Sequence, residues 1–292
     1  MDRITLQLLN LVTLKQYKHT QMKHLILKAV LVSGLTFLAA GTLKAQEEVK
    51  EVKDSVKRKK FEINYGVGIT IGEKKDSTGK VDQNKGRFVG GITFTRLDIG
   101  FSKLVDNGSF SLSPVNDFLD YKPWKTSTLS FDVLQFGYRF NNHFKVYLAG
   151  GFDWTHIRLD RDITIQKNKP TLEYTEDDIM YSKNRFSSSY VHFPLNFEFR
   201  TKENNHGKRV RFVIGPEVAF LLSGKVKQIS DELGKVKVKD DYHFTPFRYG
   251  GAVRIGYGGI GVFAKYYAND MFDTDAQKGL KNMSFGITFG LN

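Results

Sequence analysis

Residues 283–291 alternate large apolar side chains with small or polar ones. The segment reads MSFGITFGL, which places five bulky side chains on one face of a β-strand and Ser, Gly or Thr on the other. Similar alternation recurs about eight times, and the resulting sheet would carry more apolar surface than a protein of 292 residues can cover. A bilayer can cover it, and closed antiparallel barrels are the only β-structures that span membranes. The pattern predicts an all-β fold, a transmembrane antiparallel up-and-down β-barrel.

The composition fits strands better than membrane helices. The mean hydropathy is −0.35, and alternating strands hide their apolar half in such an average. The chain contains no cysteine, which excludes disulfides and thiolate chemistry and permits an oxidising compartment.

The N-terminal region has the pattern of a secretory signal. An apolar run over residues 29–41 follows basic side chains and precedes a cleavage-like site between Ala45 and Gln46. A run of about a dozen residues suits a signal better than a membrane-spanning helix, which needs about 20. A retained anchor is the alternative. Because Met22 has the context of the natural start, we expect residues 1–45 to be an extension followed by the signal peptide.

The chain is basic, with a formal charge of +13. Residues 1–45 contain six Lys or Arg and one Asp, so the exported chain would keep a charge of about +8. Nucleic acid is not expected as the partner of an exported chain. Outer-membrane lipid and the phosphates of lipopolysaccharide match surplus Lys and Arg better, and a merely soluble surface is the alternative.

Residues 46–85 are expected to form a charged periplasmic linker, with the pattern of a strand or hairpin at 61–72. The remaining residues, 86–292, are expected to form the barrel. Strand-like runs occupy residues 61–72, 88–103, 127–140, 144–157, 189–200, 210–222, 247–257, 260–267 and 283–291.

The connections between these runs alternate in length. This indicates a barrel with two unlike ends, and outer-membrane barrels have short periplasmic turns and long extracellular loops. We therefore expect a bacterial outer-membrane location with both termini in the periplasm. The short connections are 141–143, 201–208 and 258–259, and the long ones are 104–126, 158–188, 223–246 and 268–282.

Eight strands between residues 88 and 291 give the even number typical of such barrels. The alternative is a ten-strand barrel in which 88–103 is split, because its apolar phase changes near Thr95 and Arg96. That dipeptide makes a poor tight turn, so a bulge within one strand explains the change better.

The faces opposite the apolar ones place charged residues in the lumen. A symmetric turn at 201–208 would set Glu198 opposite Arg211 and His192 opposite Glu217. Because an eight-stranded barrel is only wide enough for side chains to fill, we expect a paired network that plugs it, with a narrow ion or proton path as the alternative. The predicted network comprises Arg139, Lys145, Asp153, His192, Glu198, Arg200, Arg211, Glu217, Arg248, Arg254 and Lys265.

No catalytic motif has the context that its chemistry needs. The G-x-G-x-x-G at 256–261 lies between two strands with no following helix, so a Gly-Gly hairpin explains it. An enzyme would have to use His156, His243 and the serines at 187–189 near the outer rim. Acidic residues in 158–188 offer a divalent cation site, but interspersed Arg and Lys favour a self-neutralising loop. We expect no catalysis, cofactor or metal.

Two motifs carry a family resemblance. Residues 189–199, SYVHFPLNFEF, and 212–217, FVIGPE, resemble the Y-L-x-x-P-L-x-x-E-F and A-G-P motifs of PorT-like outer-membrane β-barrel proteins. Residues 240–249, followed by 254–257, are similar to the next hairpin of that group. The resemblance covers residues 86–292 and implies an eight-stranded barrel of the kind often called porin-like. Some relatives assist protein secretion, and the family supplies no catalytic residues.

These observations together favour an exported outer-membrane barrel with a structural or accessory interaction role, exercised through envelope or secretion proteins. A narrow porin-like channel and an outer-membrane lipid-modifying enzyme are the two alternatives.

Overall fold

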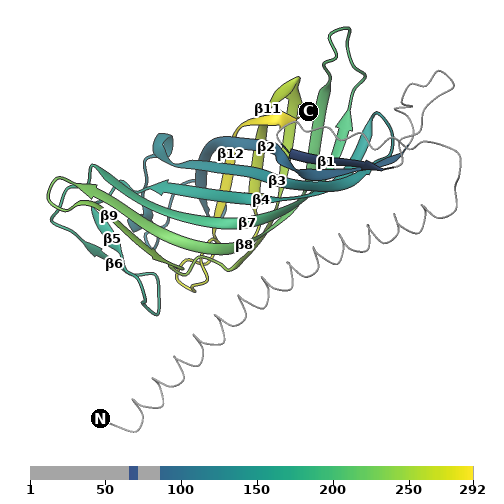
Figure 1. Cartoon of the computed structure of the whole chain (residues 1–292). Helices are drawn as coiled ribbons and strands as arrows, with labels where there is room; N and C mark the ends of the chain where they lie inside the picture. Colours follow the sequence, from purple (N-terminus) through teal and green to yellow (C-terminus); the bar gives the residue numbers. More distant parts are fainter. Residues whose placement is uncertain (1–65, 72–85, 292) are drawn as a thin grey trace, which may run out of the picture. The chain divides into compact units, whose positions relative to one another are not determined.

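The fold consists of antiparallel β-strands (Figure 1). The computed structural model describes residues 66–71 and 86–291. Helical structure in these ranges is limited to two single-turn 3-10 helices, η2 (Asp117–Leu119) and η3 (Pro123–Lys125). The strands are β1 (Gly66–Ile71), β2 (Arg87–Asp106), β3 (Ser127–Arg139), β4 (Phe144–Arg158), β5 (Ile163–Ile165), β6 (Tyr174–Glu176), β7 (Lys183–Arg200), β8 (Val210–Ser230), β9 (Gly234–Asp240), β10 (Phe247–Tyr257), β11 (Gly259–Tyr267) and β12 (Leu280–Leu291).

Eight of these strands close into a ring. They pair in the order β2, β3, β4, β7, β8, β10, β11 and β12. The ring is closed by β12, which pairs with β2 and places Ser284 opposite Ser102. The expected all-β, antiparallel, up-and-down barrel is thereby confirmed.

Two further strands extend the ring at its edges. Residues 66–71, within the run expected to be a strand or hairpin, form β1 and pair with the first half of β2. The second additional strand, β9, pairs with the last residues of β8. The expected signal peptide (1–45), its cleavage site at Ala45 and Gln46, and residues 46–65 and 72–85 of the expected linker (46–85) lie outside the described residues.

A bulge interrupts the register of β2 without breaking the strand. Ile92 pairs with Leu134 of β3 and Arg96 pairs with Asp132, so the three residues between Ile92 and Arg96 face a single residue of β3. The outward face therefore changes from even to odd positions inside one strand, as the apolar pattern indicated. The ten-strand alternative, which needed a turn at Thr95 and Arg96, is wrong.

The tightest connection is the two-residue hairpin between β10 and β11. Tyr257 pairs with Ile260, and the two residues between them, Gly258 and Gly259, have φ angles of +58° and +95°. Positive φ at both central positions is the geometry that favours glycine in hairpin turns. The Gly-rich motif at 256–261 is thus a turn.

The hairpin between β7 and β8 has a different register from the expected one. Arg200, and not Glu198, lies opposite Arg211, and His192 lies opposite Ala219. The connection between Arg200 and its partner is two residues longer on the β8 side than predicted, and within it the Thr201 amide donates to the Val210 carbonyl. This two-residue difference in pairing preserves the inward face of every residue, since the side-chain period of a strand is two.

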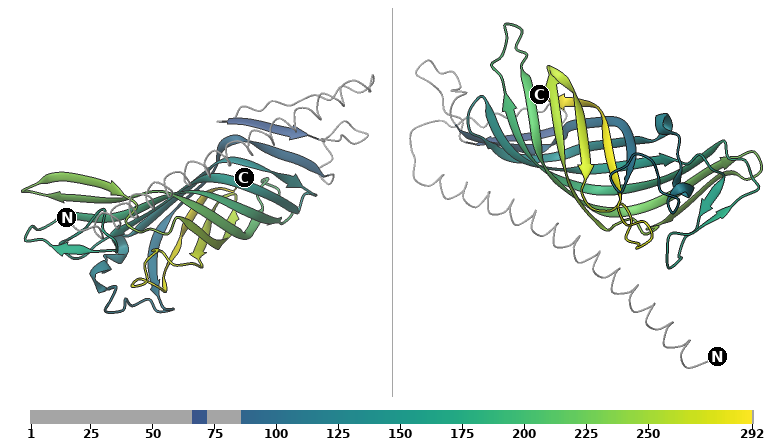
Figure 2. Two further views of the ribbon diagram at one scale, coloured as in Figure 1. Left: turned by 90° about the horizontal axis from the view of Figure 1, so that it is seen from below. Right: turned by 180° about the vertical axis from the view of Figure 1, so that it is seen from behind.

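The ring has one end with short connections and one with long connections. We call them the turn end, formed by residues 140–143, 201–209 and 258, and the loop end. Strands β7 and β8 run further into the loop end than expected, to Lys183 and Ser230, and β9 follows β8 there. The segments expected as long loops at 158–188 and 223–246 therefore contain strands β5, β6 and β9, which gather at that end (Figures 1 and 2).

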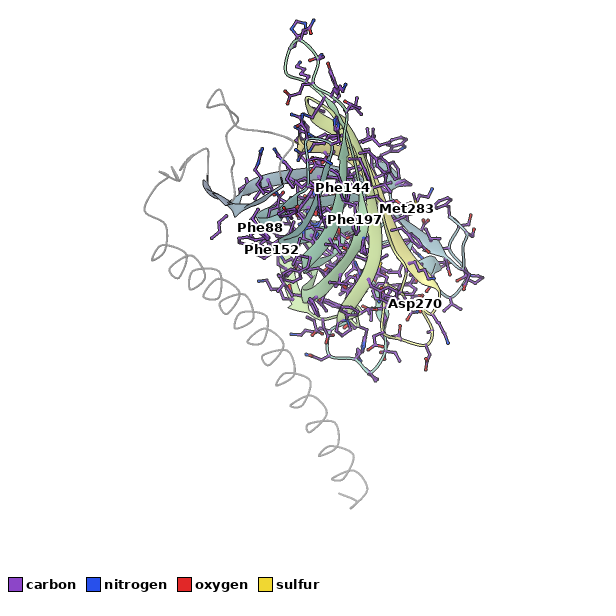
Figure 3. The ribbon with its side chains drawn as sticks, turned by 90° about the vertical axis from the view of Figure 1, so that its right-hand side faces the viewer. Phe88, Phe144, Phe152, Phe197, Asp270 and Met283 are labelled. Atoms are coloured by element: carbon purple, nitrogen blue, oxygen red, sulfur yellow. The ribbon has the colours of Figure 1, made fainter. Side chains whose placement is uncertain are left out.

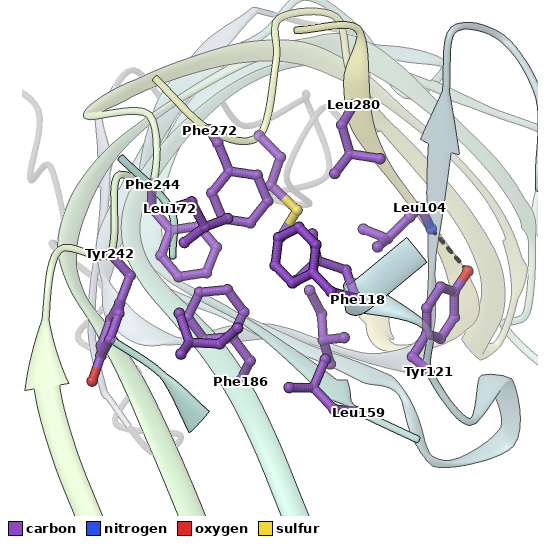
Figure 4. Close-up of a cluster of buried hydrophobic side chains, with 14 of the residues drawn as sticks. Leu104, Phe118, Tyr121, Leu159, Leu172, Phe186, Tyr242, Phe244, Phe272 and Leu280 are labelled. Carbon is purple, nitrogen blue, oxygen red and sulfur yellow. Dashed lines mark hydrogen bonds between the residues drawn. The ribbon is translucent and has the colours of Figure 1, made fainter. Parts of the chain in front are cut away.

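An apolar cluster fills the loop end. Phe186 of β7 stacks on Phe244 at 4.7 Å between ring centroids, and Phe244 stacks on Phe272 at 4.9 Å. The Leu104 amide donates to the Tyr121 hydroxyl at 3.1 Å, which ties β2 to the connection after η2 (Figure 4). The buried members are Leu104, Phe118, Leu119, Tyr121, Ile157, Leu159, Ile163, Ile165, Leu172, Phe186, Val226, Tyr242, Phe244, Met271, Phe272 and Leu280. We call them the cap.

The outward face of the ring carries exposed apolar side chains on every strand, so that side chains stand on both faces of the sheet (Figure 3). Such a band of apolar residues is the surface that a barrel presents to lipid. Its exposed members include Ile99, Phe101, Phe136, Leu148, Phe199, Phe212, Ile214, Ile255, Val262, Phe285, Ile287 and Phe289.

Candidate functional site

A chain of ion pairs runs through the interior of the ring from strand to strand. Its first link joins β10 to β2, where Arg254 Nη2 lies 3.0 Å from Asp98 Oδ2. Arg96 Nε lies 3.3 Å from the same oxygen of Asp98. Arg96 Nη2 then donates a hydrogen bond of 3.0 Å to Asp132 Oδ1 of β3. Each of the four side chains is at most 4% exposed, so each charge depends on its neighbours and not on water.

His192 of β7 continues the chain. Its Nε2 lies 3.0 Å from Asp132 Oδ1, and its Nδ1 lies 3.0 Å from Glu217 Oε1 of β8. An imidazolium has a donor on each ring nitrogen, so a doubly protonated His192 matches a carboxylate on either side. The imidazole is fully buried.

The last links cross from β8 to β11 and β4. Lys265 Nζ lies 3.4 Å from Glu217 Oε1 and 2.9 Å from Asp153 Oδ2. The Tyr267 hydroxyl lies 2.8 Å from one oxygen of each carboxylate. Cations and carboxylates therefore alternate across the full width of the lumen, which is the arrangement that offsets the desolvation of buried charge.

A second group of charges surrounds Glu198 nearer the turn end. Arg200 Nε donates to Glu198 Oε1 at 2.5 Å, and Lys145 Nζ lies 3.6 Å from Glu198 Oε2. Arg211 Nε lies 3.7 Å from Glu198 Oε1. One carboxylate thus faces three cations, and Arg139, which is half-buried nearby on β3, has no ion-pair partner among the described residues.

Arg248 is held by aromatic rings and not by a carboxylate. Its guanidinium carbon lies 4.2 Å from the ring centroid of Tyr190 and 5.3 Å from that of Tyr267. The side chain is 1% exposed, and within the described structure its three guanidinium nitrogens have no hydrogen-bond partner. Cation–π contacts with two tyrosines stabilise its charge in place of an ion pair.

A small cavity separates the two charged groups. Its volume is about 20 Å³, which is room for about one water molecule. Side chains fill the lumen around it, as the width of an eight-stranded barrel requires. Its lining comprises Thr95, Arg96, Asp132, Gln135, Lys145, Tyr147, Glu198 and Gly290.

Sequence reasoning selected most of these residues and missed three. All the predicted lumen residues except Arg139 and Arg248 make an ion pair. Arg96, Asp98 and Asp132 were overlooked, although they connect Arg254 to His192. Strict alternation would have found Asp98, because Leu97 and Ile99 on either side of it belong to the apolar face.

Three of the residues considered for catalysis contact the backbone, whereas Ser188 Oγ and His156 Nδ1 are buried without a hydrogen-bond partner among the described residues. Ser187 Oγ and Ser189 Oγ donate to the carbonyl groups of Lys225 and Ser223 at 3.3 and 3.1 Å. His243 Nε2 lies 2.8 Å from the backbone carbonyl oxygen of Lys169. His156 lies opposite Ser187 in the register.

The acidic residues of the 158–188 segment are mostly paired. Asp160 lies 2.9 Å from Lys122, and Glu176 lies 3.6 Å from Arg161. Asp177 accepts hydrogen bonds from the hydroxyl groups of Thr164 and Tyr181, and burial raises the pKa of the Tyr181 phenol. Across the described residues we find no set of three or more potential ligands that could hold a metal ion.

Comparisons with known proteins place the chain in a family. A family model described as "Outer membrane protein beta-barrel domain" matches residues 44–292. No curated protein matches. Among solved structures, Ail, the attachment invasion locus protein of Yersinia pestis, in complex with the heparin analogue sucrose octasulfate, is similar at 14% identity. The match covers 70% of this chain and 98% of that one, with a TM-score of 0.29.

None of the helices in the described ranges is both long and apolar enough to cross a membrane. The closed ring, its apolar outer face and the family match over most of the chain lead to one conclusion. The chain belongs to the family of outer membrane protein β-barrel domains.

Proposed function

We propose that this protein is a closed outer-membrane barrel, without transport or catalytic activity, that serves as a structural or accessory interaction protein. The single observation that supports this is the alternating chain of ion pairs from Arg254 to Asp153, which occupies the lumen where a solute would have to pass. Its members come from β2, β3, β4, β7, β8, β10 and β11.

The energetics of buried charge support a permanent plug. Breaking one pair inside a protein leaves its partner desolvated and costs about 3 to 5 kcal/mol. Opening a path wide enough for an ion would separate several of these pairs at once. The cap adds a second barrier at the loop end, because its aromatic rings are packed against one another.

The orientation is part of the proposal. Short turns belong to the periplasmic side of outer-membrane barrels and long loops to the outside. We therefore place the turn end, with the N- and C-termini, in the periplasm and the cap at the cell surface. In this proposal, residues 1–45 contain the signal peptide that directs export. Residues 46–85 form a periplasmic linker before the barrel.

The finer assignment is to PorT-like barrels, on the motifs at 189–199 and 212–217. Pro194 of the first motif pairs with Glu217 of the second. A barrel that neither conducts nor catalyses would act through its surfaces, and envelope or secretion proteins are the partners that this assignment favours.

Planar-bilayer recording tests the closed lumen. We expect no unitary conductance steps from the purified barrel, while a trimeric porin reconstituted in the same way conducts. Steps in the wild-type recording would favour the narrow channel instead. In a deletion strain, loss of secreted proteins would support the accessory role, whereas altered outer-membrane lipids in mass spectra would favour a lipid-modifying enzyme.

A further inference from the structure

Two rows of basic side chains cross the loop end of the sheet formed by β4, β7, β8 and β9. In one row Arg158, Arg185, Lys227 and Lys237 occupy successive paired positions on the four strands. In the row below it, Lys225 pairs with Lys239. We call these six residues the basic face.

All six side chains point away from the cap. Ile157, Phe186 and Val226 alternate with them along β4, β7 and β8, and these three are buried in the cap. Because successive side chains of a strand point to opposite faces, the basic residues lie on the outward face. This is the face that, further along the same strands, carries the apolar residues of the barrel wall.

The cations of the basic face lack acidic partners. No carboxylate lies within ion-pair distance of any of the six in the described part of the chain. Arg158 Nη2 donates to the carbonyl of Ser182, and the Nε of Arg185 has no hydrogen-bond partner among the residues that the structure describes. Lys225 lies beyond the membrane-spanning part of β8, and partial burial, with repulsion from Lys239 and Arg185, lowers its pKa. A site whose cations repel one another favours the binding of an anion.

Protection of an edge strand explains only part of this pattern. Lysines on β9 would discourage pairing with another chain, as charged residues do on exposed sheet edges. Arg185 and Lys227 lie on β7 and β8, which are paired on both sides. Their charge protects no edge, so it needs another explanation.

The two rows of the basic face lie within the headgroup layer and at its outer limit. Trp154 of β4 lies on the outward face, with its ring 5.3 Å from that of Phe131, and Trp marks the membrane interface in such proteins. The row of Lys225 and Lys239 is level with His156, two residues beyond Trp154 toward the loop end. Arg158 lies four residues beyond Trp154 in the same direction. At about 3.3 Å per residue and a tilt near 40°, these rows stand roughly 5 and 10 Å above Trp154. The headgroup layer extends about 5 to 8 Å beyond the hydrocarbon, so the row of Lys225 and Lys239 stands within it and the row of Arg158 stands at its outer limit.

We propose that the basic face binds the phosphate groups of lipopolysaccharide in the outer leaflet. The acyl chains would lie against the apolar wall below, and the phosphates would contact the two cationic rows above it. Arg supplies paired donors that fit phosphate oxygens, and Lys supplies point charges. The inference rests on the proposed orientation, which places the loop end at the cell surface, and it is independent of whether the lumen conducts.

Native mass spectrometry of the full-length barrel in detergent tests the site, with bisphosphorylated lipid A as the probe. The test variant carries Arg185→Gln, Lys225→Gln, Lys227→Gln and Lys237→Gln. A matched control removes four exposed lysines elsewhere, by Lys167→Gln, Lys202→Gln, Lys208→Gln and Lys278→Gln. A third variant, with Lys225→Arg, Lys227→Arg and Lys237→Arg, keeps the charge. Heat-modified migration on SDS gels establishes that each variant is folded.

We expect the test variant to bind lipid A at least roughly tenfold more weakly than the wild type, given what each cation near an anionic surface contributes. The matched control and the arginine variant should bind like the wild type. Dephosphorylated lipid A should bind weakly to all of them. Equal binding by the test variant and the control, or binding that ignores the phosphates, overturns the proposal.

Two further readouts separate the possible failures. Inorganic polyphosphate is the soluble competitor: if it binds the basic face while lipid A does not, the face takes a soluble polyanion and the proposal is wrong. Because binding in detergent does not depend on orientation, its failure is distinct from a failure of the proposed topology. Trypsin cleavage of the loop end on intact cells tests that topology separately.

Discussion

His192 lies 3.0 Å from Glu217 although the two residues are not opposite each other in the β7–β8 pairing, where Ala219 faces His192. The contact is diagonal, between inward-facing side chains two positions apart in register. Diagonal neighbours on one face of an antiparallel pair are within reach of long side chains. The same diagonal geometry brings Arg211 to within 3.7 Å of Glu198.

Removing His192 should destabilise the barrel strongly. His192→Leu leaves Asp132 and Glu217 facing each other without the cation between them, and breaking a buried ion pair costs about 3 to 5 kcal/mol. Urea unfolding in detergent, followed by tryptophan fluorescence, measures the loss. His206→Leu, at an exposed position in the turn after β7, is the control and should change the free energy of unfolding little. Equal stability of the two variants would mean that His192 contributes no buried pairing.

The link between β10 and β2 should appear as energetic coupling. In a double-mutant cycle of Asp98→Asn and Arg254→Gln, we expect the two single changes to be non-additive by about 1 to 3 kcal/mol, because the side chains are in direct contact. The free energy of unfolding of the four proteins supplies the measurement. Additive effects would contradict the 3.0 Å contact between them.

Parts of this interior were predictable from the sequence and parts were not. Alternation alone selects an inward face, which is why Glu198, Glu217 and Lys265 were identified as lumen residues. The pairing needed the turn geometry: a two-residue error at the β8 side of the turn moved every expected partner by two positions. A shift of two keeps each side chain on its face, so the composition of the network survived although its register was wrong.

The loop end was the hardest part to predict. Strand β8 was expected to stop at residue 222 because Lys225 and Lys227 break the apolar alternation, yet Val226 and Gln228 continue the inward face. The cap draws its residues from segments between residues 104 and 280. No local periodicity reports contacts over such separations, so these segments could only be assigned as loops.

The cap should open independently of the barrel. Phe186→Ala removes a ring that contacts Tyr242, Phe244 and Phe272, and large-to-small changes of buried Phe cost about 3 to 5 kcal/mol. We expect faster trypsin cleavage between β5 and β6, with heat-modified migration of the barrel unchanged. Met180→Ala, at a side chain that is 80% exposed, should leave the cleavage rate as it is. If trypsin cleaves the Phe186→Ala variant between β5 and β6 no faster than the wild type, the cap does not hold this segment.

Close strand packing at Gly151 should tolerate no side chain. A Cβ there would lie 1.9 Å from the Phe131 carbonyl oxygen, whereas the nearest atom to a Cβ at Gly251 is 3.4 Å away. Gly151→Val should therefore prevent refolding into detergent, and Gly251→Ala should refold with nearly the wild-type yield, since only the second site has room. Gel shift assays of refolding compare the two. A normal yield for Gly151→Val would place β3 and β4 further apart than described.

The closure between β2 and β12 carries the whole account, because without it the lumen has no wall and the ion pairs no interior. The chain has no native cysteine, so a disulfide placed across this seam reports on it directly. Ser102→Cys with Ser284→Cys joins two paired positions, and Ser102→Cys with Thr288→Cys, four residues off register, is the control. We predict that the first pair crosslinks in native outer membranes, giving a denatured band that reducing agent shifts, and that the control does not. A seam pair that stays reduced under oxidising conditions, or crosslinks no better than the control, would contradict the closed barrel.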